Sequence, residues 1–369
     1  MKYFLLRFFC SSMLVFVSLG LSAQADTDSS QVVTDSSRTS IFGLPVVFYT
    51  PETRWGFGAA GVFTWRFKRE SDESRPSQVQ PAFAYTVEDQ VLAYLPFQTW
   101  WKEELYTVFG ELGWYRYNYF YYGVGNDIPQ DFEELYGVTY PRLRITAMRE
   151  FDLGFYAGIR IIADDFEITD LDPDGRLADN NVAGTNGGLN TGVGLILNYD
   201  SRDNYLSTTE GTYAEFTLDF HRMDLYSDFS YNRTRLDLRK FFKTGKDGVV
   251  ALQFFTESIR GSAPFISLAL LGGTKLHRGF YEGRYRDKNS ASIQAEYRRH
   301  VYGRFGVVGF AALGMVAQRY NRLSLGNLRN TWGGGVRYTL NKEERIKIRF
   351  DVGVGNGQPA FYLTIGEAF

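Results

Sequence analysis

The sequence predicts an all-β protein, a sixteen-stranded antiparallel transmembrane β-barrel. Three observations predict this fold: apolar and polar residues alternate along many segments, an export signal opens the chain, and long connections alternate with short ones. In a membrane barrel the outward side chains meet lipid and the inward ones a polar lumen, so alternation with period two is expected. The competing fold is a soluble β-sandwich, which would bury its apolar rows against a second sheet.

The N-terminus predicts export. Lys2 and Arg7 form a basic segment, the apolar stretch from Phe8 to Leu21 follows it, and Ala23-Gln24-Ala25 forms a cleavage site. Residues 1–25 therefore have the pattern of a signal peptide. The apolar stretch is too short to span a membrane as a helix. Cys10, the only cysteine, lies within it, so we expect a mature chain without a disulfide or a thiol nucleophile.

A short tail and one barrel domain are expected to follow. Residues 26–41 are polar and of low complexity, which predicts a disordered periplasmic tail, and residues 42–369 form the predicted barrel.

The sixteen predicted strands lie at residues 42–50, 55–69, 78–87, 91–102, 103–116, 135–150, 151–166, 188–200, 208–222, 226–243, 247–259, 289–302, 303–318, 328–341, 344–355 and 358–369. An even number suits a barrel with both ends in the periplasm. The long connections then all lie on its outer side, at residues 117–134, 167–187, 260–288 and 319–327.

Alternation is clearest in the second half of the chain. In the predicted strand at 344–355, one face carries Ile346, Ile348, Phe350, Val352 and Val354, and the other carries Lys347, Arg349, Asp351 and Gly353. An Arg or Lys that faces lipid at the midplane costs ~2–4 kcal/mol, so the charged rows are expected to face a watery lumen.

The end of the chain is predicted to continue this pattern. Phe361, Leu363, Ile365 and the terminal Phe369 share one face, and Glu367 is expected in the headgroup zone. We take Phe369 as a C-terminal assembly signal, to be recognised by the outer-membrane barrel-assembly machinery.

Composition alone does not distinguish a membrane barrel from a soluble β-protein. A net charge of −2 and 22% charged residues are ordinary for a soluble protein, whereas 17% aromatic residues and 38 glycines favour a barrel with aromatic belts at the membrane interfaces. The aromatic run at residues 114–122 is accordingly expected in the outer-leaflet belt.

No catalytic or metal-binding motif stands out. The three histidines, His221, His277 and His300, are widely spaced, and no Gly-x-Ser-x-Gly elbow is present. The acidic stretch at residues 164–175 lacks the spacing of an EF-hand and is interpreted as a solvated outer loop. We therefore expect no enzyme activity, metal, cofactor or nucleic-acid partner.

Two constellations carry a family resemblance. The first is Leu276-His277-Arg278-Gly279-Phe280 with the following Tyr281 to Asp287 and Ala295-Glu296-Tyr297-Arg298, and the second is Asn198 to Asn204 with Gly211-Thr212-Tyr213. Together they resemble the bacterial surface antigen superfamily, the BamA/TamA-type sixteen-stranded barrels. These proteins assemble outer-membrane proteins or move polypeptides across that membrane. The resemblance covers residues 190–369 well and is fainter before them.

The resemblance implies that the long sixth outer loop folds inward. In the family an Arg-Gly-Phe/Tyr tip of that loop is pinned by acidic residues of the inner wall, which implies such a role here for Arg278, Gly279 and Phe280, with Glu296 and Asp351 as partners. Two departures from the family pattern, His277 before the arginine and Ala312 where an Asp is usual, imply a different salt-bridge network. The alternative is that Arg278 is an ordinary charge on an exposed loop.

The segment Asp200-Ser201-Arg202-Asp203-Asn204, with Gly211 after it, has two readings. One is an ion or ligand site. The other, which we favour, is a turn in which Asp and Asn side chains cap backbone amides and Arg202 pairs with a neighbouring carboxylate.

The expected function follows from the resemblance. We expect an outer-membrane barrel that aids insertion or translocation of protein or lipid, embedded in lipid and lipopolysaccharide and aided by a separate periplasmic partner. The family's periplasmic POTRA domains do not fit the short stretch before the first strand. The Gly353, Gly355, Gly357 and Gly366 positions near the last strand are expected to soften a seam that opens laterally. The alternative is a passive channel or a structural barrel with a plugged lumen.

Overall fold

The computed structural model describes residues 39–50, 54–71, 74–129, 131–178, 182–342 and 345–369. The predicted signal peptide and residues 26–38 of the predicted tail lie outside the described residues. The strands are β1 (Thr39–Thr50), β2 (Arg54–Trp65), β3 (Ser77–Val79), β4 (Ala82–Thr86), β5 (Val91–Trp101), β6 (Tyr106–Tyr121), β7 (Glu134–Asp152), β8 (Phe155–Thr169), β9 (Gly188–Asp200), β10 (Gly211–His221), β11 (Ser230–Thr244), β12 (Gly248–Ser262), β13 (Ala269–Leu271), β14 (Tyr285–Asp287), β15 (Asn289–Tyr302), β16 (Phe305–Ala317), β17 (Arg329–Asn341), β18 (Ile346–Gly355) and β19 (Gln358–Ile365). Short 3-10 helices lie in the connections: η1 (Met223–Leu225), η2 (Phe265–Ser267), η3 (Tyr320–Arg322) and η4 (Leu325–Asn327). No helix in these ranges is long and apolar enough to cross a membrane.

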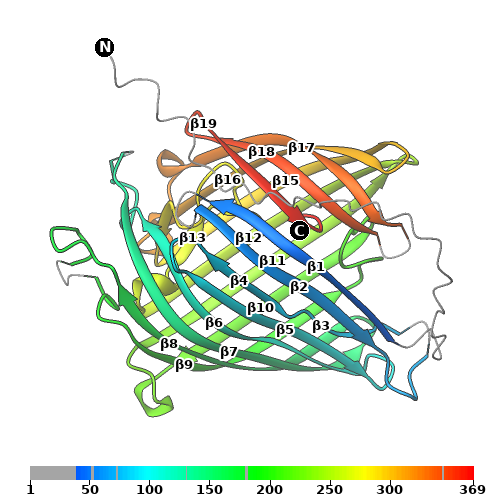
Figure 1. Cartoon of the computed structure of the whole chain (residues 1–369), viewed down its shortest axis with the longest axis horizontal. Coiled ribbons are helices and arrows are strands. Elements are labelled where there is room, and N and C mark those ends of the chain that lie inside the picture. The colour runs from blue at the N-terminus through cyan, green and yellow to red at the C-terminus, as the bar shows by residue number, and fades with distance from the viewer. Residues whose placement is uncertain (1–38, 51–53, 72–73, 130, 179–181, 343–344) are drawn as a thin grey trace.

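Seventeen of the strands form one antiparallel sheet that curls into a barrel (Figure 1). β3 and β4 both pair with β2 on one side and with β5 on the other, so together they fill one position and the sheet has sixteen positions. The break between them falls at Gln80-Pro81, where proline has no amide hydrogen to donate to the ladder. The predicted strand at 78–87 is thus interrupted.

Several strand boundaries differ from the prediction by three to five residues, and three of them affect the architecture most. β1 begins at Thr39, inside the predicted tail, and β6 continues to Tyr121 instead of ending at residue 116. β19 ends at Ile365 because Gly366 has a φ of +86°, which turns the chain away from the strand direction. The last residues therefore leave the barrel wall.

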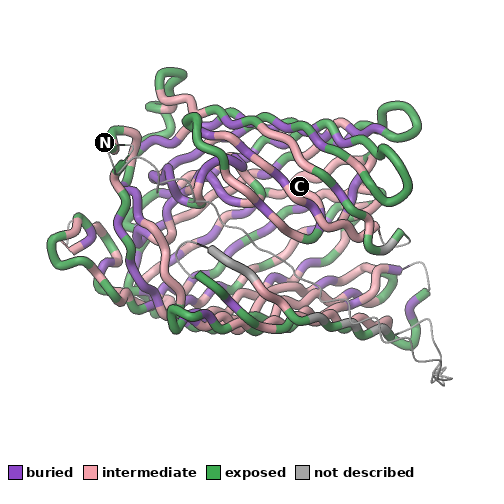
Figure 2. Tube along the Cα trace, turned by 45° about the horizontal axis from the view of Figure 1, so that its top comes forward, coloured by how far each residue is buried: buried purple, intermediate pink, exposed green. Residues whose placement is uncertain are grey.

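The two faces of the wall carry the predicted alternation (Figure 2). In β15, Ile293 and Tyr297 are 54% and 46% exposed on the outside, while Gln294 and Glu296 are 3% and 2% exposed on the inside. The outward residues are apolar because they meet lipid, and the inward ones are polar because they meet the lumen and its contents.

Inward charges are paired from strand to strand around the lumen. Such ion pairs join Arg142 to Asp164, Arg144 to Asp164, Arg160 to Asp219 and Arg233 to Glu257. Within β11, Arg239 also pairs with Asp237. Pairing offsets the desolvation cost of a charge within a crowded lumen. This explains how a barrel wall tolerates rows of charged residues.

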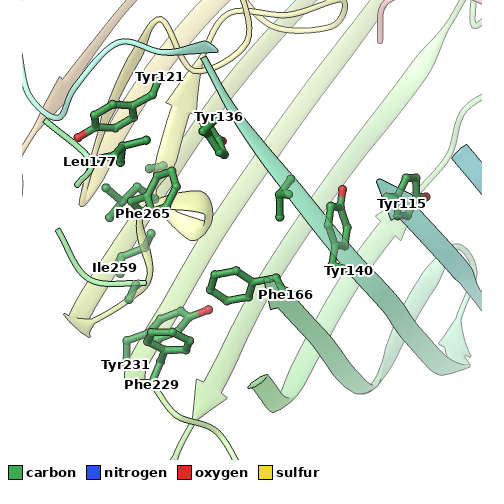
Figure 3. Packing of buried hydrophobic residues seen from close by; sticks show 14 residues of the cluster. Tyr115, Tyr121, Tyr136, Tyr140, Phe166, Leu177, Phe229, Tyr231, Ile259 and Phe265 are labelled. Carbon is green, nitrogen blue, oxygen red and sulfur yellow. The ribbon is translucent and has the colours of Figure 1, made fainter. Parts of the chain in front are cut away.

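Below, the outer end of the barrel is the end with the long loops, and the inner end is the opposite one. Buried aromatic and aliphatic side chains close the lumen at the outer end (Figure 3). This outer cluster consists of Tyr115, Tyr121, Tyr136, Val138, Tyr140, Phe166, Leu177, Phe229, Tyr231, Ile259, Ala263, Phe265, Leu268 and Ala269. Leu177 and Phe265 come from the β8–β9 and β12–β15 loops, so these loops fold into the lumen.

The outer cluster overturns part of the aromatic-belt prediction for residues 114–122. Trp114 is exposed on the outside, but Tyr115 and Tyr121 are buried inside, where Tyr115 stacks on Tyr140 with ring centroids 4.8 Å apart. Strand alternation sends every second residue of the run inward. A run rich in aromatic residues therefore supplies side chains to both faces of the wall.

Candidate functional site

The β12–β15 connection, residues 263–288, is the sixth outer loop, and it lies inside the barrel. Its two short strands, β13 and β14, pair with each other. Tyr285, Arg286 and Asp287 of β14 are all buried, and Gly125 of the β6–β7 loop donates its amide to the Arg286 carbonyl at 2.8 Å. The loop is thus fixed at its outer part, and its tip reaches further into the lumen.

Arg278 stands at the tip and is 1% exposed. Its Nη1 donates to Asp351 of β18 at 2.6 Å, and its Nη2 donates to Glu296 of β15. The guanidinium lies over the ring of Phe310 in β16, with Cζ 3.6 Å from the ring centroid. Two carboxylates and an aromatic face surround this cation, so it is not an ordinary charge on an exposed loop.

Glycines permit the close approach of the tip to the wall. Gly279 has a φ of +125°, and a Cβ there would lie 2.7 Å from the Val354 carbonyl carbon. On the wall, a Cβ at Gly353 would meet the Arg278 carbonyl at 2.5 Å, and one at Gly355 would meet the Phe280 ring at 2.4 Å. Gly353 and Gly355 therefore serve contact with the loop, in addition to the predicted softening of the seam.

Tyr362 of β19 holds the backbone of the tip. Its hydroxyl accepts a hydrogen bond from the Gly279 amide at 2.8 Å and donates to the Phe280 carbonyl at 3.2 Å. Phe280 packs edge-on against Tyr285, with centroids 5.2 Å apart. The tip therefore rests on the last two strands of the barrel, β18 and β19.

Further charges extend the contacts of Arg278 into a group that we call the lumen network, comprising Arg278, Glu296, Arg298, Arg337, Lys347, Arg349, Asp351 and Glu367. Arg337 joins Asp351 at 2.5 Å to Glu367 at 2.7 Å, and Arg298 contacts Glu296 at 2.8 Å. The inward rows of β15, β17 and β18 could have indicated Arg298 and Arg337. Nothing in the strand pattern indicated Glu367.

The C-terminal residues correct the prediction most clearly. Phe369 does not face lipid: it is 7% exposed, packs against Phe241 and Ala251, and its carbonyl oxygen accepts from Arg298 at 2.8 Å. Glu367 is not in the headgroup zone, and its contacts with Arg298, Arg337 and Lys347 hold the pKa of this carboxyl below its usual range. The turn at Gly366 carries both residues into the lumen.

The two departures from the family pattern have structural counterparts. His277 is fully buried at a φ of +50°, and burial lowers its pKa to about 4. A Cβ at Gly314 would lie 2.3 Å from its Nε2, so that glycine makes room for the ring. Ala312 is buried beside Phe310, and the carboxylates at Arg278 come from other strands.

The segment at residues 200–204 forms a turn at the inner end. Asp200 pairs with Arg202 at 2.9 Å, and Asn204 Oδ1 accepts from the amides of Leu206 and Ser207. Asp203 accepts from Thr209 and pairs with Arg345 at 2.5 Å, which lowers the pKa of its carboxyl to about 2.

Gly211, which follows this turn, has a φ of +116°, and a Cβ there would lie 2.3 Å from the Ser201 carbonyl oxygen. The side chains cap backbone amides, as the turn reading requires. Among the residues that the structure describes, no group of three or more His, Cys, Asp or Glu side chains could hold a metal ion.

The first and last strands form the seam of the barrel. β1 pairs with β2 over its whole length, and β19 pairs with β18, but the described residues include no ladder between β1 and β19. A strand edge that lacks a continuous ladder is a place where another strand can add to the sheet.

A curled antiparallel sheet with an apolar outside and a charged inside defines an outer-membrane β-barrel. The family model described as "Omp85 superfamily domain" matches residues 16–369, and the chain belongs to this superfamily. This membership confirms the resemblance to BamA-type barrels and the outer-membrane location.

Solved structures share the fold. BamA from Haemophilus ducreyi lacking POTRA domains 1–3 is 11% identical with a TM-score of 0.59, and the match covers 89% of this chain and 69% of that one. CdiB from Acinetobacter baumannii is 10% identical with a TM-score of 0.58, covering 89% and 59%, and CdiB from Escherichia coli is 11% identical with a TM-score of 0.56, covering 90% and 63%. The chain thus spans less than two thirds of either CdiB. No curated protein matches the sequence.

Proposed function

We propose that this barrel aids insertion or translocation of protein or lipid at the outer membrane, together with a separate periplasmic partner. Membership of the Omp85 superfamily supports a role of this general kind. The specific client belongs to the proposal and is a polypeptide or lipid that passes the seam between β1 and β19.

One observation carries the proposal: the buried loop tip is fastened to β18 and β19, the last strands before the seam. Arg278 contacts β18 through Asp351, and Gly279 contacts β19 through Tyr362. Any outward movement of β18 and β19 at the seam would disturb these contacts. The loop tip therefore acts as a lock that holds β18 and β19 in the wall, and its release allows β19 to move outward and pair with a client strand.

The plugged-barrel alternative remains a second candidate because loops fill the outer lumen. Phe265 and Leu177 are 1% and 0% exposed in the outer cluster. A barrel closed in this way would conduct little, whatever happens at its seam. A static plug and a working seam differ in whether other molecules reach the β19 edge.

Crosslinking in cells tests the proposal. A photoreactive amino acid at Ile365, which faces outward on β19 and is 49% exposed, should capture periplasmic or nascent outer-membrane polypeptides. The control position is Leu195 on β9, which faces outward with 54% exposure but has ladders on both sides. Equal capture of protein at the two positions, or capture of lipid alone at both, would refute the role of the seam.

A further inference from the structure

A cavity of about 190 Å³ opens at the inner end of the barrel, on the inner side of the loop tip. Its walls are the inner ends of β11, β12, β15, β16, β17 and β18, together with the β9–β10 turn and the C-terminal tail. The volume corresponds to roughly six water molecules at about 30 Å³ each, so it admits a small polyatomic ion or the headgroup of a lipid.

The lining of this inner cavity is strongly basic. Its positive residues are Lys243, Lys246, Arg298, Arg299, Arg337 and Lys347, and its negative residues are Asp247 and Glu367. Six positive and two negative charges leave a net charge of +4 without counting His300. Within the described parts of the chain, Lys243 and Lys246 have no acidic partner, so much of this charge is uncompensated.

Arg337, which lines the cavity, supplies a second and independent observation. It is 3% exposed, and its Nε and Nη1 contact Glu367 and Asp351. Its Nη2 is buried without a hydrogen-bond partner among the described residues. A buried donor left without an acceptor is costly, and a bound anion would provide that acceptor.

We propose that the inner cavity binds a phosphate group, either as free phosphate or as part of a lipid headgroup. A guanidinium fork and several ammonium groups suit the oxygens of phosphate, and a net charge of +4 suits a dianion better than a single carboxylate. Phosphate binds beside Glu367, whose carboxylate shares Arg337 and Lys347 with it. This inference goes beyond the proposed function and does not depend on any client.

Thermal unfolding of the full chain in a phosphate-free, non-ionic detergent tests the site. Inorganic phosphate should raise Tm in a saturable manner relative to chloride at equal ionic strength. Lys243→Gln with Lys246→Gln should raise the half-saturating phosphate concentration about tenfold, equivalent to the loss of about 1.4 kcal/mol. The control is Lys68→Gln with Lys342→Gln, which removes two exposed charges outside the cavity and should change nothing.

A third variant separates ligand binding from general stabilisation. Glu367→Gln removes the competing negative charge and should tighten phosphate binding even though it weakens the fold. Weaker binding in this variant, a phosphate effect equal to that of chloride, or equal losses in the two double lysine variants would overturn the proposal.

Native mass spectrometry with added phosphatidylglycerol then identifies the source of the phosphate. Retention of the lipid by the unmodified chain but not by the Lys243→Gln, Lys246→Gln variant assigns the site to a headgroup. Saturation by inorganic phosphate without lipid retention assigns it to free phosphate. If neither inorganic phosphate saturates the effect nor the lipid is retained, the proposed phosphate site is refuted.

Discussion

At the scale of single residues, the loop tip is held by shared rather than exclusive partners. Glu296 pairs with Arg278 and Arg298, and Asp351 pairs with Arg278, Arg337 and Arg349. Removal of Arg278 therefore leaves each carboxylate with another cation. Removal of Asp351 leaves three buried arginines short of one anion.

The difference between losing Arg278 and losing Asp351 predicts which of two variants is less stable. Arg278→Ala should lower the free energy of unfolding by about 1–3 kcal/mol, and Asp351→Asn by about 3–5 kcal/mol, because uncompensated buried charge is the larger cost. Urea unfolding of the folded barrel in lipid vesicles would measure both values. A smaller loss in Asp351→Asn than in Arg278→Ala would show that the network is not organised around Asp351.

Gly279→Ala tests the close approach of the tip. The new Cβ would lie 2.7 Å from the Val354 carbonyl carbon at a φ of +125°, so the tip must move, and we expect a loss of about 3 kcal/mol together with freer protease access to the loop. The matched control is Gly303→Ala in the β15–β16 turn. Gly303 also has a positive φ, +62°, but nothing lies within 4 Å of its Cβ position, so only the conformational cost of about 1 kcal/mol applies. Equal losses would argue against a tight tip.

The burial of His277 predicts that the stability of the folded barrel depends on pH. The folded pKa of His277, about 4, lies below the ordinary value near 6.5, so the unfolded chain binds the proton more tightly. The contribution of neutral His277 to the free energy of unfolding is present in full above about pH 6.5. It is lost as the pH falls toward 4, at a rate of at most about 1.4 kcal/mol per pH unit. The difference in Tm between the unmodified chain and His277→Gln should therefore change across this window, and a constant difference would contradict it.

At the scale of elements, β19 has two roles: it forms part of the lipid-facing wall, and it holds the loop tip. Its outward face meets lipid through Ile365, while Tyr362 on its inward face holds the loop tip. The turn at Gly366 then takes the last residues across the inner end to β11 and β12, where Phe369 packs on Phe241 and Ala251. The tail thus ties the edge strand to the opposite part of the wall.

Phe369→Ala should reveal this tie. Loss of a ring that is only 7% exposed should cost about 3 kcal/mol, whereas Phe305→Ala, at a position 56% exposed on the outer surface, should cost less. Comparison of denaturant midpoints of the purified, folded variants measures stability separately from any effect of Phe369 on assembly in the cell. Equal midpoints would place the terminal ring outside the core.

At the scale of the whole molecule, the lumen is divided into layers. The outer cluster closes the outer end, the lumen network holds the loop tip below it, and the inner cavity opens at the other end. A barrel filled in this way is a poor passive pore.

Conductance in planar bilayers should follow from this filling. The unmodified chain should give small or brief currents, and deletion of residues 274–284, which removes the loop tip, should increase current through the partly vacated lumen. A large and steady current from the unmodified chain would favour the passive-channel alternative. The Gly303→Ala variant serves as the control because it leaves the loop intact.

The sequence by itself determined the barrel and the positions of most strands, because the pattern that separates lipid from lumen is local and repeats every second residue. It also indicated Arg278, Glu296 and Asp351, through a motif and the inward parity of two strands. Only the tertiary structure decided the places of Glu367 and Phe369, since a single left-handed glycine at residue 366 redirects the tail, and that conformation leaves no periodic trace. The shared contacts of the lumen network were decided there too, because they join strands far apart in sequence whose spacing depends on how the sheet closes around the loop.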